Sequence, residues 1–164
     1  MKMLNLNEIS QNRDFDFLGL KDSFFLLGLI STFENRYQAV ADTFFQEISW
    51  KQFFTMICIK LCKTTPKITE LADIIGTSHQ NTRQILKKLQ AKNFIKIATS
   101  ADDKRKQYVT LTEKGREFCE ERHKSSKIPV KKIFSGLDEK QIQLTIQTII
   151  QLEKNLEKLS DKEF

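Results

Sequence analysis

The sequence predicts a mainly α-helical fold that carries one small β-hairpin. Of the 164 residues, 40% are hydrophobic and only five are Gly and two are Pro, which favours a packed helical core over a turn-rich all-β fold. Apolar side chains recur with helical spacing along most of the chain, whereas residues 94–98 and 107–112 alternate with period two. The length suits one compact domain, or a small domain with helical extensions.

Two helices are expected in the first part of the chain. Residues 14–47 predict one helix, with an apolar and aromatic face that includes Phe17, Phe24, Leu27, Phe33 and Tyr37. Residues 50–61 predict the other, because its apolar side chains step at i, i+3, i+4, i+7, i+8 and i+11 and Ser49 is a favourable N-cap. The face of this second helix belongs to the core.

A helix-turn-helix pattern follows the break at "KTTPK". The helical spacing of Ile68, Leu71, Ala72 and Ile75 predicts a short helix, with Thr65 or Thr69 as its cap and Gly76 just past its end. Ser78 then caps a helix with a narrow apolar stripe: Thr82, Ile85, Leu86 and Leu89. Its other positions are polar, so this helix has one face for the core and one for water or a ligand.

The two period-two segments and the remaining helices complete the prediction. "FIKIA" and "QYVTLT" form a hairpin that places Val109 and Leu111 on one face, and the charged stretch "SADDKRKQ" forms its tip. Thr112 caps a helix through "EKGREFCEERHK", and a last helix over 138–159 carries one apolar stripe. That stripe comprises Ile142, Ile146, Ile149, Leu152 and Leu156.

The basic charge is concentrated in the middle of the chain. Residues 60–132 contain 18 Lys and Arg against 8 Asp and Glu, whereas residues 1–59 have 5 against 7 and residues 133–164 have 4 against 6. A basic centre between mildly acidic ends indicates that the centre meets a polyanion. Basic surface alone is weak support, since many solvated faces are basic.

A helix-turn-helix followed by a two-stranded wing is the winged-helix arrangement, and residues 68–118 resemble the DNA-binding core of the MarR family of bacterial transcriptional regulators. The matching features are "ELA" followed by "GTS", the segment "KKLQAKNFI", and a wing signature with Asp103 and Arg105 ahead of "LTEKG". The sequence departs from the family at Asn93, where Gly is common, and near the first wing strand, where Lys92 and Lys96 replace a frequent Arg. Asn tolerates the left-handed conformation that this turn needs.

The resemblance implies a DNA-binding surface made of the recognition helix and the wing. On the helix, the amides of Gln80 and Asn81 suit adenine and Arg83 suits guanine, although a plain polar surface is the alternative. In the wing, the resemblance places Arg105 in the minor groove, and Asp103 would orient it or a neighbouring basic side chain. The full set of expected DNA-binding residues is Ser78, His79, Gln80, Asn81, Arg83, Gln84, Lys87, Lys88, Asp103, Lys104, Arg105 and Lys106.

The resemblance also implies a homodimer on a pseudo-palindromic operator, a small aromatic or lipophilic effector, and a repressor without enzymatic activity. The expected domains are a dimerisation region over 1–47, the winged helix-turn-helix over 48–118, and dimerisation helices over 119–164. A single intramolecular helical bundle is the alternative for the terminal helices. The alternative function is a winged-helix module that binds an acidic protein and contacts DNA without sequence preference.

Other site classes have little support in the sequence. Cys58, Cys62 and Cys119 form no disulfide framework or zinc spacing with the two His residues, so we expect core cysteines, with redox sensing as the open alternative. No clustered acid–base pair, P-loop or metal motif is present, and no cofactor is expected. The first residues have no signal-peptide pattern, and the longest apolar run is too short for a membrane span, so a cytoplasmic protein is expected.

Overall fold

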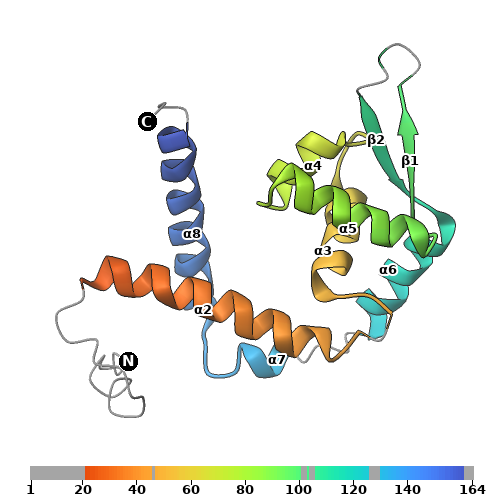
Figure 1. Ribbon diagram of the computed structural model, residues 1–164. Coiled ribbons are helices and arrows are strands. Elements are labelled where there is room, and N and C mark those ends of the chain that lie inside the picture. The colour runs from red at the N-terminus through yellow and green to blue at the C-terminus, as the bar shows by residue number, and fades with distance from the viewer. Residues whose placement is uncertain (1–20, 46, 101–102, 104–105, 126–129, 161–164) are drawn as a thin grey trace. The chain divides into compact units, whose positions relative to one another are not determined.

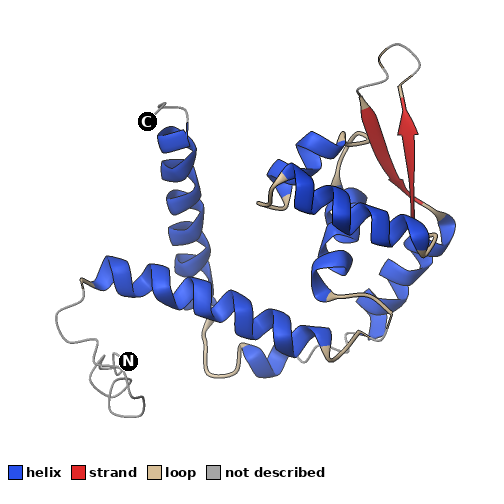
Figure 2. Cartoon of the chain, in the orientation of Figure 1, coloured by secondary structure: helices blue, strands red, loops and turns tan. Residues whose placement is uncertain are grey.

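The computed structural model describes residues 21–45, 47–100, 103, 106–125 and 130–160, and it divides into two compact units, Met1–Ser125 and Ser126–Phe164. The described residues are helical apart from one hairpin, which confirms the predicted fold class (Figures 1 and 2). The elements of the first unit are α2 (Asp22–Asp42), α3 (Trp50–Leu61), α4 (Ile68–Ile74), α5 (His79–Ala91), β1 (Ile95–Thr99), β2 (Gln107–Leu111) and α6 (Glu113–Ser125). The second unit contains α7 (Val130–Ile133) and α8 (Glu139–Ser160).

Helix α2 is shorter than the helix predicted over residues 14–47. It begins at Asp22, residues 14–20 lie outside the described part, and it ends at Asp42. At its end, the Thr43 hydroxyl donates to the Val40 carbonyl (2.7 Å), and the Asp42 carboxylate accepts the amide of Trp50, so side chains provide two of the hydrogen bonds of this turn. Phe24 and Phe33 of the predicted apolar face are 61% and 59% exposed.

The caps of α3 and α4 explain where these helices begin. Ser49 caps α3 as predicted: its hydroxyl accepts the Gln52 amide (3.2 Å), and the Gln52 side chain accepts the Ser49 amide (3.0 Å). The cap predicted for α4 at Thr65 or Thr69 is wrong. Lys67 occupies the N-cap, and the Glu70 carboxylate accepts the Lys67 amide at 2.9 Å, so this helix start is held by a side chain of the first turn that reaches back and not by a threonine hydroxyl.

The wing is an antiparallel pair of strands that the structure ties to the start of α4. Ile95 pairs with Leu111 and Ile97 with Val109 in the register, which puts the buried side chains of β2 on one face as predicted. The Val109 amide donates to the carbonyl of Pro66 (3.0 Å), and Lys67 forms a β-bridge with Tyr108. The second wing strand is therefore fixed to the helix-turn-helix by backbone hydrogen bonds.

One apolar core joins α3, α4, α5, α6 and the hairpin. Its largest fully buried side chains include Phe94, Met56, Leu71, Leu86 and Leu89, each with no exposed surface. A chain of aromatic ring contacts extends this core toward α2. The ring centroids of Phe94 and Phe118 lie 4.9 Å apart, and further ring contacts lead from Phe118 to Phe53, Trp50 and Tyr37 in turn. The predicted core stripe of α5 is confirmed, since all of its members are buried.

The base of the wing is clasped by the segment that leads into α6. Thr112 caps α6 as predicted, because its hydroxyl accepts the Gly115 amide (3.0 Å), and the same hydroxyl donates to the Asn93 carbonyl (2.7 Å). Asn93 adopts a φ of 60°, the left-handed conformation expected of it. At Gly115 a Cβ atom would lie 2.1 Å from the Phe94 carbonyl oxygen, so no larger residue fits without backbone movement. We name this arrangement, Asn93, Phe94, Thr112 and Gly115, the wing clasp.

The C-terminal unit consists of two helices with no fully buried side chain among the described residues. Asp138 and Gln141 cap α8 reciprocally, with hydrogen bonds of 2.7 and 2.9 Å. The predicted α8 stripe remains half-buried or exposed, with Ile146 at 45% and Leu156 at 59%. Helix α7 was not predicted. None of the helices in the described ranges is both long and apolar enough to span a membrane.

Candidate nucleic-acid interface

Helix α5 has the two faces that a recognition helix requires. Its apolar stripe anchors it in the core, and Ser78 caps its start by accepting the Asn81 amide at 3.2 Å. Thr82 is fully buried and donates its hydroxyl to the Ser78 carbonyl (3.0 Å), which fixes the first turn. In Figure 1, α4 and α5 lie side by side, with the wing extending beyond them.

The outward face of α5 is polar and carries no acidic residue. The predicted site residues that the structure leaves exposed on this helix and its cap are Ser78, His79, Gln80, Arg83, Gln84, Lys87 and Lys88. Asn81 differs from them, since its side chain is half-buried and its amide donates to the Thr77 hydroxyl at 2.7 Å. Its amide is thus engaged within the protein, and reading a base would require it to leave Thr77.

The cations on α5 are available to an external anion. Arg83, Lys87 and Lys88 form no ion pair with any of the described residues. A helix face with several unpaired cations and no carboxylate attracts phosphate, and the attraction falls with added salt. The face predicted to meet a polyanion therefore has the charge that this role needs.

The described part of the wing tip contains a charge pair. Asp103 is half-buried, and its carboxylate lies 3.8 Å from the ammonium group of Lys106. Lys106 is thus a basic neighbour of Asp103, and the predicted use of Asp103 to orient Arg105 or a neighbouring basic side chain stays a prediction. Lys104 and Arg105, the other predicted wing residues, lie outside the described residues. Of the two lysines near the first strand, Lys96 is exposed, and Lys92 donates to the Glu47 carbonyl.

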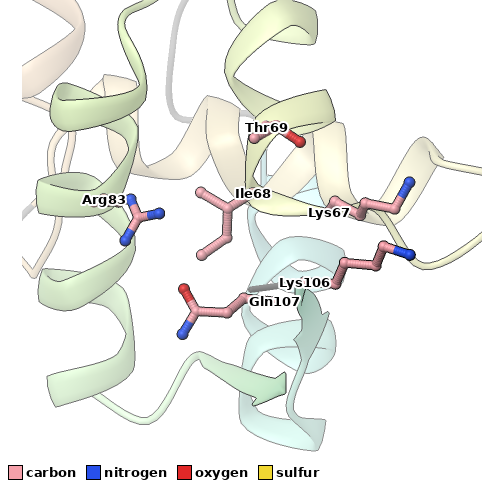
Figure 3. A pocket seen from close by; sticks show the side chains of 6 residues that line it. All are labelled: Lys67, Ile68, Thr69, Arg83, Lys106 and Gln107. Carbon is pink, nitrogen blue, oxygen red and sulfur yellow. The ribbon is translucent and has the colours of Figure 1, made fainter. Parts of the chain in front are cut away.

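Between the wing and α5, the structure forms an open pocket that the sequence did not reveal. It encloses about 160 Å³ and is lined by Lys67, Ile68, Thr69, Arg83, Lys106 and Gln107 (Figure 3). Arg83 and Lys106 were predicted DNA contacts, whereas Lys67 was missed. Its only signal in the sequence is a basic residue next to Pro66, in the loop where a polar cap was expected.

Lys67 is held by Glu70 at the edge of this pocket. The Lys67 ammonium donates to the Glu70 carboxylate at 2.7 Å, and both side chains face solvent. This hydrogen bond raises the pKa of Lys67 and lowers the pKa of Glu70, so both groups are charged at neutral pH. An exposed pair of this kind contributes little stability, and either partner can exchange it for another ion.

A second pocket, more apolar than the first, lies between α2 and α3. It encloses about 240 Å³, and its lining includes Tyr37, Gln38, Trp50, Phe54 and Ile75. Partial burial raises the pKa of Tyr37, which keeps the phenol neutral well into the alkaline range. Glu34 and Lys51 at its edge lie 3.6 Å apart. The pocket is smaller than the 300–1,000 Å³ that drug-sized ligands usually occupy, and its lining includes three aromatic rings.

The three cysteines are free thiols. Cys58 and Cys119 are buried and Cys62 is half-buried, in agreement with the expected core positions. Burial raises the pKa of Cys119 to about 11 and also raises that of Cys58. Among the described residues, no group of His, Cys, Asp and Glu is arranged to hold a metal ion.

Comparison with known proteins supports the resemblance read from the sequence. Residues 43–122 match the family model described as transcriptional regulator SarA/Rot. This segment contains α3 to β2 and most of α6, so it includes the whole helix-turn-helix and wing. The matched family consists of regulators, in agreement with the expectation that the chain is not an enzyme.

Solved structures of MarR-type regulators share the fold at low sequence identity. A MarR protein from Peptoclostridium difficile is 18% identical, with a TM-score of 0.75, and the match covers 89% of this chain and 95% of that one. S. aureus MepR, in a complex with DNA, is 17% identical with a TM-score of 0.69, over 78% and 95% of the two chains. Bordetella bronchiseptica BpsR, whose DNA binding is regulated by 6-hydroxynicotinic acid, is also 17% identical with a TM-score of 0.69, over 78% and 98%.

Proposed function

We propose that the chain is a winged-helix regulator of the MarR/SarA type, which binds a pseudo-palindromic operator as a homodimer and represses transcription there. The observation that carries the proposal is the outward face of α5, which is polar, free of carboxylates and anchored by a buried stripe. A helix with these two faces fits the major groove, where amides and guanidinium groups distinguish base pairs. Repression, and a cytoplasmic location, are the expectations that accompany this type of regulator.

Within this proposal, α5 reads bases and the wing contacts the minor groove and backbone. Gln80, Arg83 and Gln84 are exposed on the outer side of the helix and carry base-reading groups. Arg105 enters the minor groove, and Asp103, already paired with Lys106, orders the wing tip around it. Lys87, Lys88 and Lys104 contribute contacts to phosphates.

The dimer is proposed from apolar side chains that are exposed on α2 in the first unit and on α8 in the second. On α2, Phe24, Leu27 and Phe33 are more than half exposed, and on α8 Ile146 and Leu156 face solvent to a similar degree. Soluble monomers rarely keep such contiguous apolar stripes in water, so a second copy of the chain is the proposed cover. Two winged helices then meet two half-sites about one DNA turn apart.

Binding to DNA from upstream of the gene tests the function. Fluorescence anisotropy with this duplex and with a random duplex of equal length, at several salt concentrations, should give an affinity ratio of about 10³ or more. Arg105→Ala should weaken binding substantially, whereas Lys60→Ala, which removes a lysine paired with Glu120 on α6, should not. Equal affinity for both duplexes, together with a stable acidic protein partner in pull-downs, would favour the protein-interaction module instead.

We propose the pocket between α2 and α3 as the effector site, for a small aromatic or lipophilic molecule. Trp50 is the only tryptophan in the chain and lines this pocket, so its fluorescence reports occupancy directly. A compound that changes this fluorescence should also change DNA affinity, because α3 packs against α5. Binding with no change in DNA affinity would separate the pocket from regulation.

A further inference from the structure

The pocket between α4, α5 and β2 brings together cations from three segments that are distant in sequence. Lys67 precedes α4, Arg83 lies on the second turn of α5, and Lys106 immediately precedes β2. Figure 3 shows Ile68 in the middle of the pocket, with Arg83 on one side and Lys67 and Lys106 on the other. Thr69 and Gln107 add a hydroxyl and an amide, so the lining contains donors for an anion and no carboxylate.

The backbone fixes the spacing of these groups. Because the Val109 amide donates to Pro66 and Lys67 bridges Tyr108, the start of α4 and the start of β2 cannot separate without breaking backbone hydrogen bonds. Ile68, between Arg83 and the two lysines, is buried with 5% of its surface exposed. The pocket is therefore assembled before any ligand arrives, and only the flexible ends of the lysine side chains have to adjust.

The pocket has three cations in its lining and two carboxylates paired with them, so its charge favours one additional anion. Glu70 holds Lys67 at 2.7 Å and Asp103 lies 3.8 Å from Lys106, whereas Arg83 has no ion-pair partner among the described residues. Both carboxylate partners lie outside the pocket lining and are exposed or half-buried. An incoming phosphate can therefore attract Arg83 directly and compete with Glu70 for Lys67.

We propose that this pocket binds one backbone phosphate of the DNA duplex, with Lys67 as a contact residue and Glu70 as its competitor. The inference rests on the proposed function, since the duplex is the one on which α5 lies. The occupant is a phosphodiester of that duplex because the pocket opens between α5 and the strand that leads from the wing tip, the two elements proposed to meet DNA. The contact positions the domain on DNA and carries no sequence information.

Glu70 gives the site a second property. Because Glu70 holds Lys67 in an ion pair, it reduces the binding free energy that any phosphate in the pocket contributes, whatever the DNA sequence. Its carboxylate thereby reduces non-specific binding, and the same carboxylate accepts the Lys67 amide at the start of α4. Glu70→Gln separates the two roles, because the amide oxygen can still accept that hydrogen bond while the negative charge is lost.

The test measures how salt affects the binding of full-length protein to the upstream duplex and to a random duplex of equal length. Lys67→Gln should weaken both complexes by about tenfold and reduce the slope of log affinity against log salt by about 0.9. Lys67→Arg should restore binding, and Glu70→Gln should strengthen both complexes. Lys60→Gln is the matched control, since Lys60 also pairs with a glutamate and its side chain is 39% exposed against 37% for Lys67.

The outcomes separate this inference from the proposed function. If Lys67→Gln leaves affinity and salt slope unchanged while Arg83→Gln weakens binding, the phosphate site is overturned and the regulator stands. If Lys67→Gln weakens only the upstream duplex, Lys67 reads sequence and the backbone role is wrong. If the wild-type protein binds neither duplex, both proposals fail. Equal melting temperatures of the variants, by circular dichroism, exclude a folding defect as the cause.

Discussion

The winged-helix core and helix α8 use the same kind of apolar stripe in opposite ways. In α5 the stripe is entirely buried, with Leu86 and Leu89 at 0% exposure. In α8 the stripe has the same helical spacing, yet Ile146 and Leu156 are 45% and 59% exposed and none of the described side chains is buried. Within the first unit the winged helix buries its own stripe, whereas the stripe of α8 is not buried within the second unit; in the proposed dimer a second copy covers it.

The contrast also separates what each region contributes. The winged helix has the charges and the pocket that suit DNA, and its stability comes from side chains of the same chain. None of the described side chains of the α8 stripe is buried, and its proposed role lies in association with a second copy. Substitutions in the two regions should therefore differ in whether their effect depends on protein concentration.

The largest expected effect is loss of stability from a cavity in the winged-helix core. Phe94 is fully buried, and its ring lies 4.9 Å from that of Phe118. Phe94→Ala should lower the free energy of unfolding by about 3–5 kcal/mol, because it removes apolar contacts and leaves a void. Urea unfolding followed by circular dichroism measures it. Phe134→Ala removes the same atoms from a residue that is 43% exposed and should cost far less; equal losses would contradict the contrast.

A smaller effect, dependent on concentration, is expected from α8. Ile146→Asn should weaken the proposed dimer by about 1.5–3 kcal/mol for each buried copy, because an amide replaces an apolar side chain. Analytical ultracentrifugation should show monomers at concentrations where the wild type is dimeric, with the helical content preserved. Gln147→Asn, at an exposed neighbouring position, is the control. A variant that remains dimeric would remove this face of α8 from the interface.

The smallest effect concerns the three cysteine thiols. Their rates of reaction with a thiol reagent measure how readily the reagent reaches the core, and no substitution is needed. Cys119 is buried, with a pKa raised to about 11, and Cys58 is also buried, so neither forms much thiolate at pH 8. Cys62 is only half-buried. Ellman's reagent at pH 8 should therefore label Cys62 first, and the other two only as the protein unfolds. Simultaneous labelling of all three in the native protein would mean that the winged-helix core opens readily.

Local rules predicted most of the winged helix. Ser49, Ser78 and Thr112 all cap helices as expected. A hydroxyl directly before a helix can accept an amide of the first turn that has no partner within the helix. The alternation of residues 107–112 predicted the buried face of β2 correctly. The left-handed turn at Asn93 was expected from the resemblance, which places a common Gly there, and Asn tolerates the positive φ that the turn needs.

The prediction failed where contacts between distant segments decide the structure. At the start of α4, the threonines suggested a hydroxyl cap, but Glu70 from the first turn satisfies the Lys67 amide instead. Lys67 itself joins a pocket with Arg83 and Lys106 only because the loop before α4 pairs with β2. The spacing of apolar residues in the sequence does not predict a pairing between such distant segments. The α8 stripe was found, but its sequence pattern does not say how far the stripe is buried, because burial depends on which surface packs against it.

The wing clasp has a consequence for the entropy of DNA binding. At Gly115 the backbone of α6 approaches the Phe94 carbonyl so closely that no side chain fits, and Thr112 joins both sides through Asn93 and the Gly115 amide. The base of the wing therefore has little freedom to lose when the protein docks on DNA. Because less conformational entropy is lost on association, more of the interaction free energy remains as affinity.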